Sequence, residues 1–94
     1  KMLVGILKVD ILIRWSTSLK DKRRVMRSIC DRIKSKHNVA ISQVDNCNLW
    51  QRGTFGIACV CNESRVIDNI LSRVLSDIES STEIEVIRVE TSVV

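Results

Sequence analysis

The chain has 94 residues, of which 45% are hydrophobic and 28% are charged, and its formal net charge is +4. This length allows one domain with one core, and the composition excludes a disordered or a fibrous protein. The charge is unevenly divided, because residues 1–52 hold 12 basic and 4 acidic side chains whereas residues 53–94 hold 3 and 7. Such a division predicts one basic surface that meets a polyanionic partner.

Apolar runs in this chain are short. The best candidate for a membrane segment, residues 2–7, is followed at once by Lys8 and Asp10, and it lacks the small-residue cleavage site of a signal peptide. We therefore expect a cytoplasmic protein that makes no contact with a membrane.

Strand and helix patterns alternate along the chain. Residues 2–13 place apolar and β-branched side chains at every second position, which predicts a long strand. Ser18 is typical of a helix N-cap, and Asp21 completes a capping-box pattern for a helix that ends near Lys36. The order continues with a strand over 39–47, a loop over 46–52, a strand over 54–61, a helix that Asn62 or Ser64 caps and that ends near Glu79, and a strand over 84–90.

This βαββαβ order predicts an α+β fold, a ferredoxin-like sandwich in which residues 1–94 form a single domain. Right-handed crossovers place both helices on one face of a four-stranded antiparallel sheet. The strands over 2–13 and 54–61 are largely apolar on both faces, so we expect them at the centre of the sheet. Met2, Val4 and Ile6 would then lie on the face away from the helices, where either a homodimer packed sheet to sheet covers them or the strand end simply curves.

The four cysteines occur in a chain without proline, unlike the loop-rich sequences of small disulfide proteins. Cys30 falls on an apolar helix face, and Cys59 and Cys61 fall in an apolar strand pattern, so we expect small buried hydrophobic side chains. Cys59 and Cys61 project from one strand face, and Cys47 is expected at the opposite end of the hairpin. No metal site is therefore predicted.

The first helix is strongly basic. Residues 16–36, STSLKDKRRVMRSICDRIKSK, hold eight basic side chains that are opposed only by Asp21 and Asp31. Spacings of three, four and seven bring five of these cations to one flank: Lys20, Arg23, Arg24, Arg27 and Lys34. Asp31 is placed to offset only Arg27 and Lys34.

Cations also crowd the start of this helix, where the helix dipole disfavours them. Four of them lie in the first two turns: Lys20, Lys22, Arg23 and Arg24. With the hydroxyls of Ser16, Thr17 and Ser18 and the free backbone N–H groups, they predict a phosphate site. The alternative is a solvated basic helix that keeps the protein soluble.

The loop over 48–52 combines an aromatic side chain with a cation. Trp50 could stack on a base while Arg52 reaches a phosphate, as in readers of single-stranded RNA, or Trp50 could cover the end of the core or an interface. Trp15, just before the basic helix, could likewise flank a phosphate site or form a lid on the sandwich. The two strands expected at the centre carry only one aromatic residue, Phe55, so RNA binding across the sheet face is not expected.

Signs of catalysis are weak. The only histidine, His37, lies at a helix end and has no spacing that pairs it with a nucleophile. The three glycines form neither a phosphate loop nor a dinucleotide fingerprint. We expect no enzymatic activity, no catalytic residues, no cofactor and no small-molecule substrate.

Two segments carry a resemblance to a known family. SLKDKRRV at residues 18–25 and LWQRGTFGIA at residues 49–58 resemble the YlxP-like family of small bacterial proteins, and the resemblance covers essentially the whole chain. It implies a ferredoxin-like fold and a domain of unknown function. Because the genes of this family tend to lie beside those for translation initiation and ribosome maturation, it also implies a role near ribosomal RNA. Trp15 departs from the family pattern, in which a small or turn-forming residue is expected.

The leading hypothesis is an RNA-binding or ribosome-associated accessory protein. Its phosphate contacts are expected from Lys20, Arg23, Arg24, Arg27 and Lys34, with Trp50 and Arg52 as auxiliary residues. The alternative is a non-enzymatic protein-interaction module, a homodimer whose sheet face or edge docks an acidic protein partner.

Overall fold

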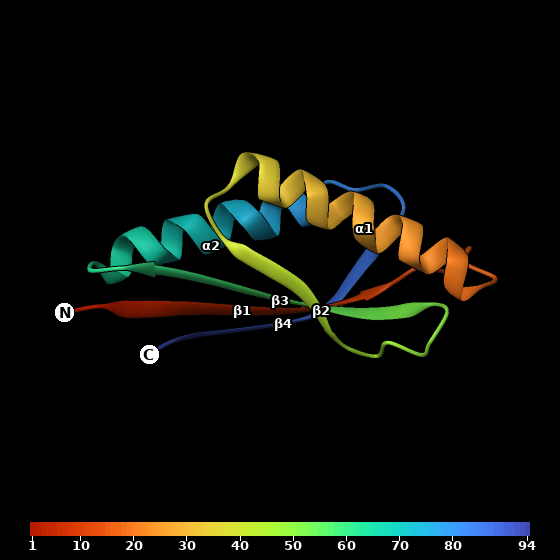
Figure 1. The fold of residues 1–94 in the computed structure, drawn as a ribbon, viewed down its shortest axis with the longest axis horizontal. Coiled ribbons are helices and arrows are strands. Elements are labelled where there is room, and N and C mark those ends of the chain that lie inside the picture. Colours follow the sequence, from red (N-terminus) through yellow and green to blue (C-terminus); the bar gives the residue numbers. More distant parts are fainter.

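All six expected elements form in the structure, a computed structural model that describes every residue from 1 to 94 (Figure 1). In chain order they are β1 (Leu3–Leu12), α1 (Leu19–Lys36), β2 (Ala40–Asp45), β3 (Arg52–Cys61), α2 (Ser64–Glu79) and β4 (Glu85–Val93). The strands form one antiparallel sheet in the order β2-β3-β1-β4, and both helices cover the same face (Figure 1). This architecture confirms the ferredoxin-like α+β fold, with β1 and β3 at the centre.

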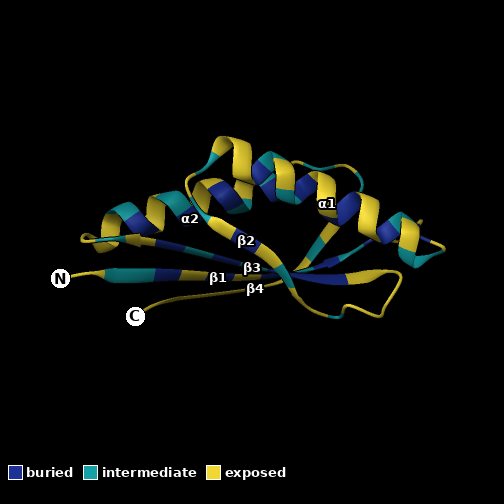
Figure 2. Cartoon of the chain, viewed as in Figure 1, coloured by how far each residue is buried: buried dark blue, intermediate teal, exposed yellow.

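The core lies between the helices and the sheet. Alternate residues of β1 point toward the helices, and Leu7, Val9 and Ile11 are fully buried. One face of each helix completes the core, through Val25, Met26, Ile29 and Ile33 of α1 and Ile67, Leu71, Val74 and Ile78 of α2. Because α1 uses that face for packing, its opposite flank is left to solvent (Figure 2).

The start of α1 agrees with the predicted cap. Ser18 is the N-cap, and its hydroxyl accepts a hydrogen bond from the backbone N–H of Asp21 at 3.0 Å. The reciprocal bond of the capping box differs, since the Asp21 carboxylate accepts from the backbone N–H of Thr17 rather than from that of Ser18. The prediction for α2 is wrong: Glu63 holds the N-cap position and makes no side-chain capping bond, because Ser64 is already the first helical residue.

Strand boundaries differ from the prediction where the chain turns. β2 ends at Asp45 because Asn46 adopts a left-handed backbone conformation with φ of 57°. β4 extends to Val93, beyond the predicted end at Glu90, because it stays paired with β1 along its length. Even Val94 exchanges two backbone hydrogen bonds with Val4, at 2.8 and 2.9 Å.

The sheet face away from the helices mixes apolar and charged side chains. Met2 and Ile6 are exposed there, as predicted, and Val60 of β3 is 62% exposed. Beside them Glu90 lies 3.9 Å from Lys8. No helix of the structure combines the length and apolar character that a bilayer crossing requires.

The cysteines meet different environments, and all four thiols are free. Cys59 is buried in the core, and Cys30 and Cys61 are partly buried, in agreement with their predicted role as small hydrophobic side chains. Cys47 is exposed in the loop that follows β2.

Candidate nucleic-acid interface

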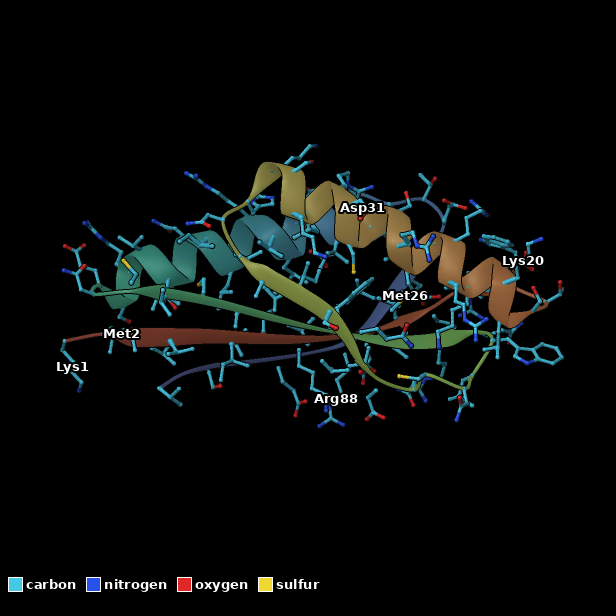
Figure 3. The ribbon with its side chains drawn as sticks, viewed as in Figure 1. Lys1, Met2, Lys20, Met26, Asp31 and Arg88 are labelled. Atoms are coloured by element: carbon cyan, nitrogen blue, oxygen red, sulfur yellow. The ribbon has the colours of Figure 1, made fainter.

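The five predicted cations of α1 all point to solvent. We call them the basic flank: Lys20, Arg23, Arg24, Arg27 and Lys34. All but Lys34 line a shallow hollow along the helix, together with Asp21, Ser28 and Asp31. In Figure 3, Lys20 and Asp31 lie on the side of α1 away from the sheet, whereas Met26 points into the core.

Only one member of the basic flank is neutralised by a carboxylate. Arg24 Nη2 lies 3.5 Å from Glu83 Oε2, and the Arg24 guanidinium stacks 5.3 Å from the centre of the Trp15 ring. Trp15 is itself tied to this end of the molecule, because its indole N–H donates to the carbonyl of Glu83 at 3.2 Å. Trp15 and Arg24 therefore join the start of α1 to the connection before β4.

The other four cations of the basic flank form no ion pair. The expectation that Asp31 offsets Arg27 and Lys34 is wrong, because Asp31 makes no ion pair with either. The carboxylate of Asp21 is also engaged elsewhere, with the backbone N–H and the hydroxyl of Thr17, both at 3.1 Å. The positive charge of Lys20, Arg23 and Arg27 therefore remains uncompensated within the chain.

The hydroxyls expected to serve a phosphate site at the start of α1 are already engaged within the chain. Thr17 donates both of its hydrogen bonds to Asp21, and the Asp21 N–H donates to Ser18. Ser16 is buried, and its hydroxyl donates to the carbonyl of Ser18 at 3.0 Å. The hydrogen bonds from Thr17, of which that from the backbone N–H acts most strongly, hold the pKa of Asp21 below its ordinary value, so this carboxylate is ionised and repels an anion at the helix end.

Lys22 does not belong to the exposed cations of the first two turns. It is 1% exposed, and its Nζ donates to the backbone carbonyl of Asn46 at 2.5 Å. Burial lowers the pKa of the Lys22 ammonium from its ordinary value of 10.5. Lys22 thus holds the loop after β2 against α1 and is not available to a ligand.

That loop, residues 46–51, lies at the same end of the sandwich as the start of α1. Gln51 fixes it there, because its side-chain amide donates to the carbonyls of Arg14 and Ser16 at 2.9 and 3.2 Å. Trp50 is 55% exposed and therefore does not close the end of the core. With Leu49, Gln51 and Arg52 it lines a second shallow depression.

A separate polar cluster joins the far end of α1 to α2. Asp77 Oδ1 lies 2.9 Å from Arg32 Nε, and Asp77 Oδ2 lies 3.1 Å from His37 Nε2. Burial opposes ionisation of the Asp77 carboxyl, but the hydrogen bonds from His37 and Arg32 outweigh it and hold the pKa of Asp77 below its ordinary value of 3.8. Asp77 is the only side-chain partner of His37, so this histidine serves as a link between helices.

Several of these partners lie far from the basic helix in sequence. Glu83 is separated from Arg24 by 59 residues, and Asp77 from His37 by 40, so no local sequence spacing could predict either pair.

No group of three or more His, Cys, Asp or Glu side chains is arranged to hold a metal ion.

Comparisons with known proteins place the chain in a family. Residues 4–91 match the family described as "Protein of unknown function (DUF503)". The chain belongs to this family. Among its relatives, the uncharacterized protein YlxP of Bacillus subtilis (strain 168) is 39% identical over 83 residues, which are 88% of this chain and 90% of that protein. The predicted resemblance to YlxP-like proteins is therefore confirmed.

A solved structure supports the fold independently. The de novo designed protein Foldit4 superposes with a TM-score of 0.53 at 17% identity, over 98% of this chain and 97% of that one. At this identity the likeness concerns the fold alone.

Proposed function

We propose that this protein is a cytoplasmic RNA-binding accessory factor that contacts phosphates through the basic flank of α1. The observation that carries the proposal is the row of Lys20, Arg23 and Arg27, which are exposed, adjacent and without a carboxylate partner. Steps of three and four residues space these side chains by about 4.5 and 6 Å along the helix axis. Such a row suits the successive phosphates of a nucleic-acid backbone.

The repulsion within this row supports a ligand. Like charges at these spacings destabilise an isolated helix by about 0.2–0.5 kcal/mol per pair. A polyanion removes that repulsion when it binds. The role near ribosomal RNA that the resemblance implies makes ribosomal RNA the first ligand to test.

The loop over 46–51 supplies the auxiliary part of the proposed contact. Exposed Trp50 offers a ring face on which an unpaired base can stack, and Arg52 extends the positive charge. The loop lies at the end of the sandwich where α1 begins (Figure 1), held there by Gln51. This arrangement favours single-stranded RNA over a duplex, whose bases are not free to stack.

The test is a salt series with single-stranded fragments of ribosomal RNA, measured by fluorescence anisotropy. Each phosphate contact should contribute about −0.7 to the slope of log affinity against log salt. The Arg23→Glu/Arg27→Glu variant should bind at least about tenfold more weakly and lose about 1.4 from the magnitude of that slope. Arg24 is left unchanged because it already pairs with Glu83.

The matched control carries the same change of charge on the other helix. Arg65 and Arg73 are exposed residues of α2, so Arg65→Glu/Arg73→Glu alters net charge equally without touching the basic flank. Its RNA affinity should stay within about twofold of the native value, because the lower net charge alone weakens RNA binding only slightly. Equal loss in both variants, or no loss in the first, would disprove the proposal. Binding to an acidic protein in place of RNA would support the alternative of a protein-interaction module.

A further inference from the structure

The outer edge of β4 is an unpaired strand edge whose geometry follows from its pairing with β1. Val94 and Val4 exchange both of their backbone hydrogen bonds, and such pairs alternate along antiparallel strands. The backbone groups of Arg88, Glu90 and Ser92 therefore point toward β1. Those of Val89, Thr91 and Val93 point outward, where no strand receives them.

This edge lacks most of the features that protect a free strand from pairing. β4 runs for nine residues, contains neither lysine nor proline, and is exposed along most of its length (Figure 2). Its one irregularity is a bulge at Ile87, next to the point where the register with β1 shifts. By contrast, β2, at the other edge of the sheet, has six residues and a bulge of its own at Val44.

We propose that two copies of the chain pair through β4 in antiparallel orientation, about a two-fold axis at Val89, to form one eight-stranded sheet. In this register the outward groups of Val89 meet those of Val89 in the second copy, and those of Thr91 meet those of Ile87. Val89, which is 38% exposed in the single chain, becomes covered by its own counterpart.

Charge complementarity selects this register. Arg88 lies directly opposite Glu90 of the second copy, and Glu90 lies opposite Arg88, both in non-hydrogen-bonded positions where side chains approach most closely. Both side chains lie on the sheet face away from the helices, where Arg88 is visible in Figure 3. An axis at residue 88 or 90 would place like charges together, and an axis at Thr91 would leave Glu90 opposite Ser92.

The edge pairing also keeps the existing ion pairs hydrated. The Glu90 carboxylate lies 3.1 Å from Arg88 Nη2 and 3.9 Å from Lys8 Nζ of its own chain, and the three side chains are 45% to 68% exposed. Packing two sheets face to face would remove water from these charges. The desolvation free energy of buried ion pairs exceeds their mutual attraction unless the geometry is excellent. Edge pairing adds a second carboxylate to each Arg88 and leaves that face open.

The first experiment is sedimentation equilibrium of the native protein over a concentration series. A reversible dimer is expected, and a monomer at every concentration would overturn the proposal.

The second experiment exchanges the two charges separately. Arg88→Glu alone places four carboxylates at the seam, and Glu90→Arg alone places four cations there, so each variant should dimerise about tenfold more weakly or worse. Mixed in equal amounts, the two variants carry complementary charges at both pairs and should form a heterodimer, detected by native mass spectrometry. Failure of the mixture to associate would contradict the register.

The third experiment separates edge pairing from packing of the sheet faces. Thr91→Pro removes an N–H that points outward, so pairing with β1 is retained while pairing with a second copy is lost. Thr91→Ala keeps the N–H and is the matched control. The proline variant should be a folded monomer by circular dichroism and sedimentation, and the alanine variant a dimer. A dimer in both would overturn the edge pairing in favour of a sheet-to-sheet contact.

Discussion

Lys22 shows how a single residue can be misread from its neighbours in sequence. It stands among exposed cations at the start of α1, yet it is buried and its ammonium holds the carbonyl of Asn46. Its side chain also packs beside Gly53 of β3, the position at which a Cβ would meet Met26 and Lys22. Lys22 therefore stabilises the fold by holding the loop after β2 against α1.

We predict that Lys22→Ala lowers the free energy of unfolding by about 2–4 kcal/mol, because it leaves a cavity and an unpaired carbonyl. Lys22→Met keeps the buried stem and should lose less. Urea denaturation measures both.

The pH dependence of Lys22 provides an independent check. The pKa of Lys22 is lowered in the folded protein, so burial of the charged ammonium destabilises the fold at neutral pH. The free energy of unfolding rises again as the pH increases through that lowered pKa toward 10.5. The native protein should gain stability relative to Lys22→Met over this alkaline range. A constant difference between them would show that Lys22 is not desolvated.

Trp50 is the residue whose exposure distinguishes base stacking from core packing. We predict that Trp50→Ala weakens binding of single-stranded RNA by about 1–3 kcal/mol while leaving the salt slope unchanged, because stacking involves no phosphate. The free energy of unfolding should change little, since the side chain is largely in solvent. Val60→Ala, at an exposed apolar residue of β3 outside this loop, serves as the control and should leave RNA affinity unchanged.

At the scale of the elements, the two helices are joined by one carboxylate. Asp77 of α2 receives hydrogen bonds from Arg32 and His37 at the end of α1. We predict that Asp77→Asn lowers the free energy of unfolding by about 2 kcal/mol at neutral pH, because both links lose their charged acceptor.

This contribution of Asp77 depends on pH in a defined direction. Its pKa is lowered on folding, so the stabilisation is complete above pH 3.8 and is lost as the pH falls through the lowered pKa. The difference between native protein and Asp77→Asn in urea denaturation should therefore shrink in acid. A difference that persists in strong acid would mean that the pair is not ionic.

α2 packs closely against β1 at Gly5. A Cβ added there would collide with Cγ2 of Ile67 and lie 3.1 Å from the sulfur of Cys59. We predict that Gly5→Ala lowers the free energy of unfolding by about 1–3 kcal/mol through overpacking. The Gly5→Ala/Ile67→Ala double variant should lose less than the sum of its single variants, and strict additivity in thermal denaturation would exclude the collision.

Periodicity in the sequence was sufficient to predict six elements and their order, because a two-residue repeat and a helical repeat each bury one face. It predicted the cap at Ser18 and the exposed basic flank for the same local reason. It could not predict that Asp21 closes the helix start through Thr17, nor that Glu83 neutralises Arg24. These contacts depend on loop conformation and on tertiary packing, neither of which leaves a local pattern.

For the whole molecule, the two proposals together determine where the basic surfaces lie. A two-fold axis perpendicular to the extended sheet keeps all helices on one face, so the dimer presents two basic flanks toward the same side. Once an RNA is bound at one flank, its effective concentration at the second flank is set by the distance between the two flanks.

We predict that an RNA long enough to span both flanks binds the native protein about tenfold more tightly, or better, than a fragment that reaches only one. Thr91→Pro should abolish this gain and leave affinity for the short fragment unchanged, as measured by anisotropy at low protein concentration. An equal preference for long RNA in the proline variant would show that one chain suffices.

The pairing of Val4 with Val94 brings both chain ends to one extremity of the sheet, and Figure 1 shows them at the opposite extremity from the start of α1. A dye, bead or sensor surface coupled through either end would therefore orient each molecule with Lys20 facing the bulk solution. Because antiparallel association turns the second copy around, one partner of each tethered pair would instead direct its own Lys20 toward the support. Immobilised protein should consequently capture RNA at fewer sites than its total number of chains.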